Sequence, residues 1–432
     1  AQGARDSTPF GEELACARYG GKRAMPRYST KTSLVYAADD ELNPDLSLPE
    51  IKKPPMHAKS RLLGQSFSSQ KLDPQLQRRV SAYLAMDTPW GFANTLAQED
   101  PSIAVRVFLL DNSGSTSESD GHVLHNDHRG QLQSLPATRW NEICDTALAH
   151  AEWNARAGVR SEFVLLNPPC PRDPVAGRDY AVVDSRAGNP MGQVETLAHI
   201  LRNNGPRGVT PLTARLQQLR TRLQQEVKED GRRIMLTIVT DGLPTSSNGG
   251  PTRQDQLHFV QELRTFTTAL NSFVVIRLAT DDDDAIDFYN KIDEELELPL
   301  DILDDLRGEA QEVYSCGNGW FAYTPLIHRI REGGSLEKIF DLMDERALKA
   351  PEIAMVLEFL FRRSEDPPFP RDARELYRRA KEEVASAKPV YNGRLNCMSP
   401  PVDLRLLKKA LGLTPVQRLC SLPARVRRAV LG

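Results

Sequence analysis

The sequence is organised around one stretch, Val105-Arg106-Val107-Phe108-Leu109-Leu110-Asp111-Asn112-Ser113-Gly114-Ser115. Its first six residues form a nearly continuous apolar run of strand length, which is typical of a buried strand in a parallel sheet. The run ends on an acid and two serines, Asp111, Ser113 and Ser115. Because ligands of open α/β sheets bind at the carboxyl ends of the strands, these oxygens predict a cup for a hard cation. Gly114 gives the backbone room to turn there.

Two later stretches supply further oxygens. Residues 205–212 read Gly-Pro-Arg-Gly-Val-Thr-Pro-Leu, which places the Thr210 hydroxyl in a loop before a helix that Pro211 opens. Residues 234–242 read Ile-Met-Leu-Thr-Ile-Val-Thr-Asp-Gly, a second buried strand that ends on Asp241. Taken together, Asp-x-Ser-x-Ser, the threonine before Pro-Leu, and the aspartate between Val-Thr and Gly resemble the metal-ion-dependent adhesion site of a von Willebrand factor type A domain. The resemblance covers residues 102–319.

This resemblance implies a metal site made of Asp111, Ser113, Ser115, Thr210 and Asp241, some of which bind the ion directly and others through water. It also implies one open position on the ion, which an Asp or Glu side chain of a protein partner fills. Magnesium suits this donor set best, because it takes oxygen ligands in octahedral geometry and keeps several waters. Manganese fits the same geometry, and calcium would fit at some cost.

The pattern of strands and helices predicts an α/β fold, with a doubly wound, mostly parallel sheet of the Rossmann-like type A kind. Besides the two quoted strands, we expect strands at 161–166, 180–184, 272–278 and 298–303, the second of them at the sheet edge. We expect helices at 138–157, 194–203, 211–229, 253–270, 285–296 and 308–314.

We expect three parts along the chain: 1–99, 100–320 and 321–432. The first holds an irregular arm to about residue 70 and a helix over 73–86, which Trp90 and Phe92 pack onto the following domain. The second is the type A domain. The third is helical, with helices at 325–331, 336–348, 351–362, 371–387, 404–411 and 415–430. Because no long linker precedes it, the third part is predicted to pack onto the second.

Two polar segments near the ligand-binding edge have more than one interpretation. Residues 116–137 are expected to form a long loop carrying Asp120, His122, His125, Asp127 and His128. Spacings of three could bring the imidazoles together on a helical turn, but a solvated polar loop is the favoured interpretation. The four acids at 281–284 are expected to cap a helix rather than to form an auxiliary cation site.

The function expected from these patterns is metal-dependent binding of another protein. We expect no enzyme, because the sequence holds no Gly-x-Ser-x-Gly elbow, no Walker loop and no placed acid and base. One alternative is a hydrolase that uses the open magnesium position, with His122, His125 or His128 as its base. Another is a structural subunit of a larger assembly, held through the C-terminal helices.

The composition and the cysteine spacing limit the kinds of partner and the cellular compartment that we expect. A net charge of −3 predicts no general attraction for nucleic acid or anionic lipid. No apolar run approaches the ~18 residues of a membrane-spanning helix. The six cysteines form no Cys-x-x-Cys pair, which argues against a disulfide framework or structural zinc and favours a reducing, cytoplasmic or otherwise intracellular compartment.

Overall fold

The largest sheet among the described residues has six strands, in the order β5-β4-β1-β6-β7-β8. Its strands are β1 (Ile103–Leu110), β4 (Ser161–Leu165), β5 (Tyr180–Val183), β6 (Arg233–Thr240), β7 (Ser272–Leu278) and β8 (Leu300–Leu303). All pair in parallel except β5, which is antiparallel to β4 at one edge. The quoted apolar run is the central strand β1, and every residue of β1 is buried. The prediction of an α/β fold with a mostly parallel sheet is confirmed.

The computed structural model describes residues 73–414 except 129, 169–176, 227–230, 248 and 296–297. The expected arm at 1–70 and the expected last helix at 415–430 therefore lie outside the described residues. From residue 73 onward, the described chain belongs to one compact unit. None of its described helices has the length and apolar character needed to cross a membrane.

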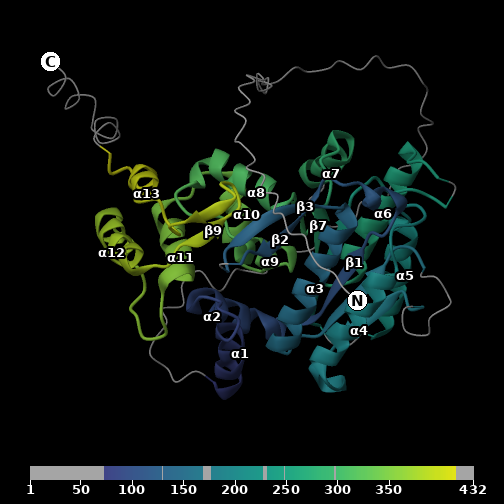
Figure 1. Cartoon of the computed structure of the whole chain (residues 1–432), viewed down its shortest axis with the longest axis horizontal. Coiled ribbons are helices and arrows are strands. Elements are labelled where there is room, and N and C mark those ends of the chain that lie inside the picture. Colours follow the sequence, from purple (N-terminus) through teal and green to yellow (C-terminus); the bar gives the residue numbers. More distant parts are fainter. Residues whose placement is uncertain are drawn as a thin grey trace, which may run out of the picture. The chain divides into compact units, whose positions relative to one another are not determined.

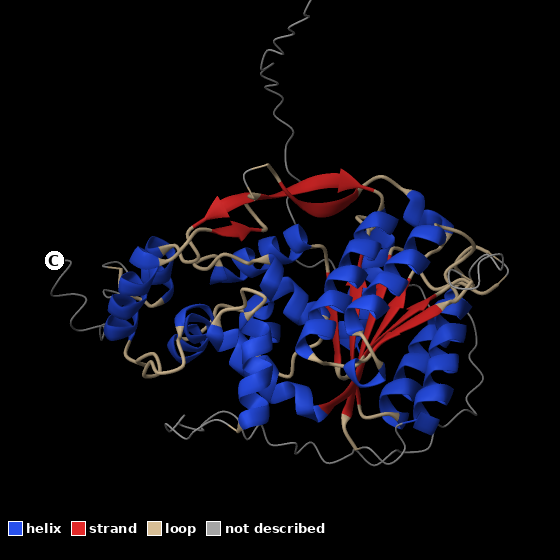
Figure 2. Ribbon diagram, turned by 60° about the horizontal axis from the view of Figure 1, so that its bottom comes forward, coloured by secondary structure: helices blue, strands red, loops and turns tan. Residues whose placement is uncertain are grey.

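Helices cover both faces of the sheet (Figure 1; Figure 2). One face packs against α5 (Leu212–Glu226), α6 (Arg253–Ala269) and α7 (Asp283–Glu295) through Val105, Val107 and Leu109 of β1. The other face packs against α3 (Arg139–Ala157) and α4 (Pro190–Asn203) through Phe108 and Leu110. Successive β1 residues point to opposite faces, which explains why a strand buried on both sides must be apolar almost throughout.

Residues 116–137 form a hairpin rather than the long loop that the sequence predicts. A short 3-10 turn, η2 (Gly114–Ser117), leads into β2 (Gly121–Asn126), which pairs antiparallel with β3 (Leu132–Ala137). Asp127 closes the turn, because its backbone N–H donates to Gln131 O at 2.8 Å and its Oδ1 accepts from Gln131 N at 2.8 Å. The expectation failed because the strands are short and mostly polar, so their pairing depends on this turn and on packing against α3.

The remaining elements form a third core beside the sheet (Figure 1). Its helices are α1 (Pro74–Leu84), α2 (Trp90–Glu99), α8 (Leu306–Val313), α9 (Pro325–Glu332), α10 (Ile339–Glu345), α11 (Ala350–Phe361), α12 (Ala373–Ser386) and α13 (Leu404–Ala410). A π-helical turn, η4 (Tyr314–Asn318), extends α8, and a small hairpin pairs β9 (Val390–Asn392) with β10 (Cys397–Ser399). The sequence patterns predicted neither α2 nor this hairpin. Asp403 caps α13, because its Oδ1 accepts from Arg405 N and Leu406 N.

Helix α2 packs onto the C-terminal helices, whereas the sequence suggested that Trp90 and Phe92 pack the 73–86 helix onto the domain that follows. Phe92 stacks on Phe340 and Phe359, with ring centroids 6.4 and 5.2 Å away. Gly91 permits this approach, because a Cβ there would lie 2.2 Å from Glu358 O on α11. The partners lie more than 240 positions away in the sequence, so no local pattern could reveal them.

The C-terminal region also packs onto the sheet, as predicted. Arg106 of β1 donates to the carbonyls of Gly333 and Gly334 just after α9. Thr237 of β6 donates from Oγ1 to Glu332 O at 2.6 Å. These buried bonds join strands in the middle of the sheet to α9.

Candidate metal centre

The Asp111 carboxylate is fixed at the end of β1. Asp111 is fully buried, and its Oδ1 accepts from Ser113 N at 2.8 Å. Its Oδ2 accepts from Thr240 Oγ1, at the end of the neighbouring strand β6, at 2.6 Å. An aspartate that bonds the backbone two residues ahead bends the chain into a tight turn. Thus the loop turns immediately after the strand, and the carboxylate has one orientation.

Both serines meet Asp241, which follows β6. Ser113 Oγ and Ser115 Oγ lie 3.0 Å apart. Asp241 Oδ1 accepts from Ser115 Oγ at 3.0 Å and lies 3.4 Å from Ser113 Oγ. Because β1 and β6 are adjacent and parallel, their carboxyl ends bring these residues together across more than 120 positions. Four of the five predicted site residues therefore form one hydrogen-bonded group.

Thr210 lies on a loop that is tied to the first one. Gly114 N donates to Gly208 O at 3.1 Å, and Thr210 N donates to Thr245 Oγ1 at 2.9 Å. Gly208 has φ +73°, and a Cβ there would lie 2.6 Å from Asn167 Oδ1, so the loop needs glycine at this position. The Thr210 hydroxyl makes no hydrogen bond with the described residues. That oxygen is thus free to bind a ligand.

Burial raises the free-energy cost of ionising Asp111 and Asp241 together. Burial raises the pKa of Asp111 to about 7, and the charge of Asp241 adds to the effect. Burial also raises the pKa of Asp241, against the hydrogen bonds from Ser115 and Arg139. A divalent cation between two buried carboxylates would remove this cost. Two carboxylates and three hydroxyls are also the oxygen donors that a hard cation such as Mg²⁺ prefers. The residues present therefore fit a magnesium ion.

Arg139 also belongs to the site, although no sequence pattern predicted it there. Its Nη1 lies 3.1 Å from Asp241 Oδ2, while Nε and Nη2 donate to the two oxygens of Asp120 at 2.7 and 2.6 Å. The hydrogen bonds from Arg139 lower the pKa of Asp120. The one available signal was its position directly after Thr138, the N-cap of α3. Asp241 therefore forms an ion pair with an arginine of the same chain.

The three histidines do not converge. His122 and His125 lie on β2, where residues three apart face opposite sides of the strand. His128 lies in the exposed turn of the hairpin. The helical turn that could have gathered the imidazoles is absent from this segment, because residues 121–126 are extended.

The acids at 281–284 act at a helix start. Asp282 Oδ1 accepts from Asp284 N at 3.0 Å, at the beginning of α7. This is the expected capping interaction.

A second acidic cluster lies in the C-terminal region. Carboxylate oxygens of Glu309, Glu312 and Asp344 lie within 4.8 Å of one another. Arg331, which is 2% exposed, pairs with Glu309 and Asp344 and lies 3.4 Å from Asp301. The guanidinium thus supplies the positive charge that these acids need, and the cluster is an ion-pair network.

Comparison with known proteins shows no family. Neither a protein-family model nor a curated protein sequence matches the chain. Among solved structures, the chain is similar to the pilus adhesin SpaC from Lactobacillus rhamnosus GG, with 15% identity and a TM-score of 0.31. The match covers 46% of this chain and 28% of the adhesin chain. A likeness this weak carries no argument about fold or function.

Proposed function

We propose that residues 100–320 form a von Willebrand factor type A domain that binds another protein through a divalent cation. The cation is Mg²⁺, held by Asp111, Ser113, Ser115, Thr210 and Asp241. The observation that carries the proposal is the meeting of two buried acids and two serine hydroxyls at the carboxyl ends of β1 and β6. This arrangement brings charge and oxygen donors to the edge where ligands of open α/β sheets bind.

The donor set favours binding over chemistry. When bound, the ion supplies an electrophilic position that a carboxylate from outside can occupy. The chain itself offers two acids and three neutral hydroxyls, so it balances the charge of the ion without surrounding it with acids. An Asp or Glu side chain of a partner is the ligand that such a position attracts.

Neither alternative gains support from an observation. A hydrolase needs a general base within reach of the site. In the described part of the chain, the side chains of His122, His125 and His128 make no hydrogen bond with the five site residues. A structural subunit would bind its partner without the ion, and a pull-down repeated with a chelator separates that case from the proposal.

Magnesium should therefore stabilise the protein, and thermal unfolding tests this. At about 100 times the dissociation constant, a ligand of the native state contributes about 2.7 kcal/mol. Each kcal/mol raises the melting midpoint by roughly 2–4 °C, so we expect a rise of about 5–10 °C.

Asp241→Ala should abolish most of this rise, whereas Asp287→Ala, which removes an exposed acid on α7, should leave it intact. If Mg²⁺, Mn²⁺ and Ca²⁺ at millimolar concentration all leave the wild-type midpoint unmoved, the proposal fails.

A further inference from the structure

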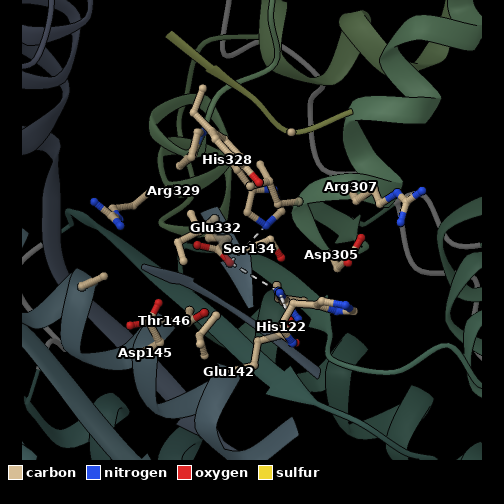
Figure 3. Close-up of a pocket in the computed structure, with 18 of the residues that line it drawn as sticks. His122, Ser134, Glu142, Asp145, Thr146, Asp305, Arg307, His328, Arg329 and Glu332 are labelled. Atoms are coloured by element: carbon tan, nitrogen blue, oxygen red, sulfur yellow. Dashed lines mark hydrogen bonds and ion pairs between the residues drawn. The ribbon is translucent and has the colours of Figure 1, made fainter. Parts of the chain in front are cut away.

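A cavity of about 290 Å³ lies where the β2–β3 hairpin, the first turns of α3, helix α9 and the β9–β10 hairpin meet (Figure 3). Its volume is about ten times the ~30 Å³ that one water occupies in the liquid. A small organic molecule or a side chain fits such a space. Its walls contain several acidic side chains and an apolar surface, and these two features determine the class of ligand that the cavity can bind.

The floor of the cavity carries an arginine that is already neutralised. Arg277 of β7 is 4% exposed, donates to Glu142 and to Leu278 O, and its Nε lies 3.3 Å from Glu332 Oε1. Two carboxylates thus face one guanidinium. The floor has no positive charge to spare for an anionic ligand.

Asp145 adds a further acid without a partner. It lines the cavity next to Glu142 on the same helix, and it makes no hydrogen bond or ion pair with the described residues. Burial raises its pKa, Arg329 lowers it, and Glu332 and Glu142 raise it further. The Arg329 guanidinium lies over the Trp153 ring, 5.7 Å from its centroid. In Figure 3, Arg329 and Arg307 lie on opposite sides of the labelled acids.

A buried histidine also has an unmet polar atom in this cavity. His328 is 6% exposed, and its Nδ1 lies 3.3 Å from the Tyr323 hydroxyl. Its Nε2 lies 3.3 Å from Glu332 Oε1 but makes no hydrogen bond of ordinary geometry. Buried polar atoms nearly always have partners, so an unmet one in a cavity indicates a ligand or water.

The apolar wall distinguishes an organic ligand from a bare metal ion. It is formed by Val123, Leu124, Pro136, Leu306 and Tyr391. The acids of this cavity also do not converge as metal ligands do; among the described residues, that geometry is found at Glu309, Glu312 and Asp344.

We propose that this cavity binds a small organic cation, a primary ammonium or guanidinium on a short aliphatic chain. The charged nitrogen lies against Asp145 beside Glu142, and the aliphatic chain lies against the apolar wall. Tyr391 also lines the cavity, and aromatic rings attract cations. This site is separate from the metal centre and does not depend on it.

Calorimetric titration of the full chain, with a chelator present, tests the proposal. The probes are n-butylammonium and agmatine, with neutral n-butanol and anionic butyrate as matched controls. Probes of this size bind at millimolar concentration at best. We expect both cations to bind and both controls to fail. A further probe is lysine amide with an acetylated α-nitrogen, which mimics a lysine side chain in a protein. If it binds more tightly than butylammonium, the occupant is a protein side chain. If it binds more weakly, the occupant is a free amine.

Asp145→Asn should weaken cation binding by roughly tenfold or more, the usual effect of losing a charged hydrogen bond. Glu152→Gln, which changes an exposed acid on the same helix, should leave binding unchanged. The melting midpoint of Asp145→Asn should stay close to that of the wild type, because Asp145 is exposed and makes no ion pair with the described residues. Equal binding of n-butanol, preferential binding of butyrate, no binding of any cation, or unchanged binding to Asp145→Asn would each overturn the proposal.

Discussion

Arg139 should compete with a metal ion for Asp241, so neutralising it should tighten magnesium binding. The guanidinium lies 3.1 Å from Asp241 Oδ2, and the arginine side chain is 12% exposed. The ion pair between Arg139 and Asp241 must weaken before a metal ion can interact with the full negative charge of Asp241. Arg139→Gln removes the positive charge while keeping a polar side chain of similar reach.

The size of the effect follows from the pair. Coulomb's law at an effective dielectric constant of about 20 gives a ceiling of about 5 kcal/mol for charges 3.1 Å apart. Hydrogen bonds between charged groups measured by mutation contribute about 1.5–3 kcal/mol. We therefore expect magnesium to bind Arg139→Gln roughly 10- to 100-fold more tightly than the wild type.

Without metal, the same variant should be less stable, since Asp241 loses its partner. The assay is thermal unfolding across a magnesium titration at pH 8, which reports both effects. Arg139→Lys keeps the charge and should behave nearly as the wild type. Arg156→Gln, an exposed arginine on the same helix, is the matched control. Magnesium binding to Arg139→Gln that is equal or weaker would refute the reasoning, because Arg139 would then orient Asp241 and not oppose the ion.

Two further predictions concern stability without metal. The pKa of Asp111 is about 7 in the folded protein against a model-peptide value of 3.8, so stability should fall as pH rises through this window. Ionised Asp111 lowers the free energy of unfolding by up to about 4 kcal/mol at pH 8, and Asp111→Asn should restore part of that stability. Urea unfolding of both proteins at pH 5 and pH 8 measures the difference. The prediction is contradicted if the stability of the Asn variant, compared with wild type, is lower at pH 8 than at pH 5. Phe92→Ala should cost about 3–5 kcal/mol in urea unfolding, because it leaves a gap against two stacked rings, whereas exposed Leu257→Ala should change stability by less than about 0.5 kcal/mol.

The sequence predicted the sheet and its flanking helices because those signals are local. An uninterrupted apolar run marks β1, whose two faces are both covered. Most helix limits agree within a few residues, since prolines and caps at their ends are visible in the sequence. The edge strand β5 was also expected, and the structure places it there.

Predicting that the metal residues lie together required one assumption beyond the local sequence pattern, namely that β1 and β6 are neighbours. In a parallel sheet the carboxyl ends of neighbouring strands share an edge, so Asp111 and Asp241 had to meet if β1 and β6 were neighbours. Their hydrogen bonds through the serines and Thr240 follow from that adjacency. Whether the ion binds stays a prediction.

Tertiary structure alone decided the rest. Arg139 reaches Asp241 across 102 positions, and no periodicity in α3 points to that pair. Phe92 finds its partners in helices at the other end of the chain. The cavity beside Asp145 exists because two hairpins and two helices from separate segments meet there. Local pattern determines which residues form an element and which face is buried, but such contacts depend on where the whole chain brings those faces together.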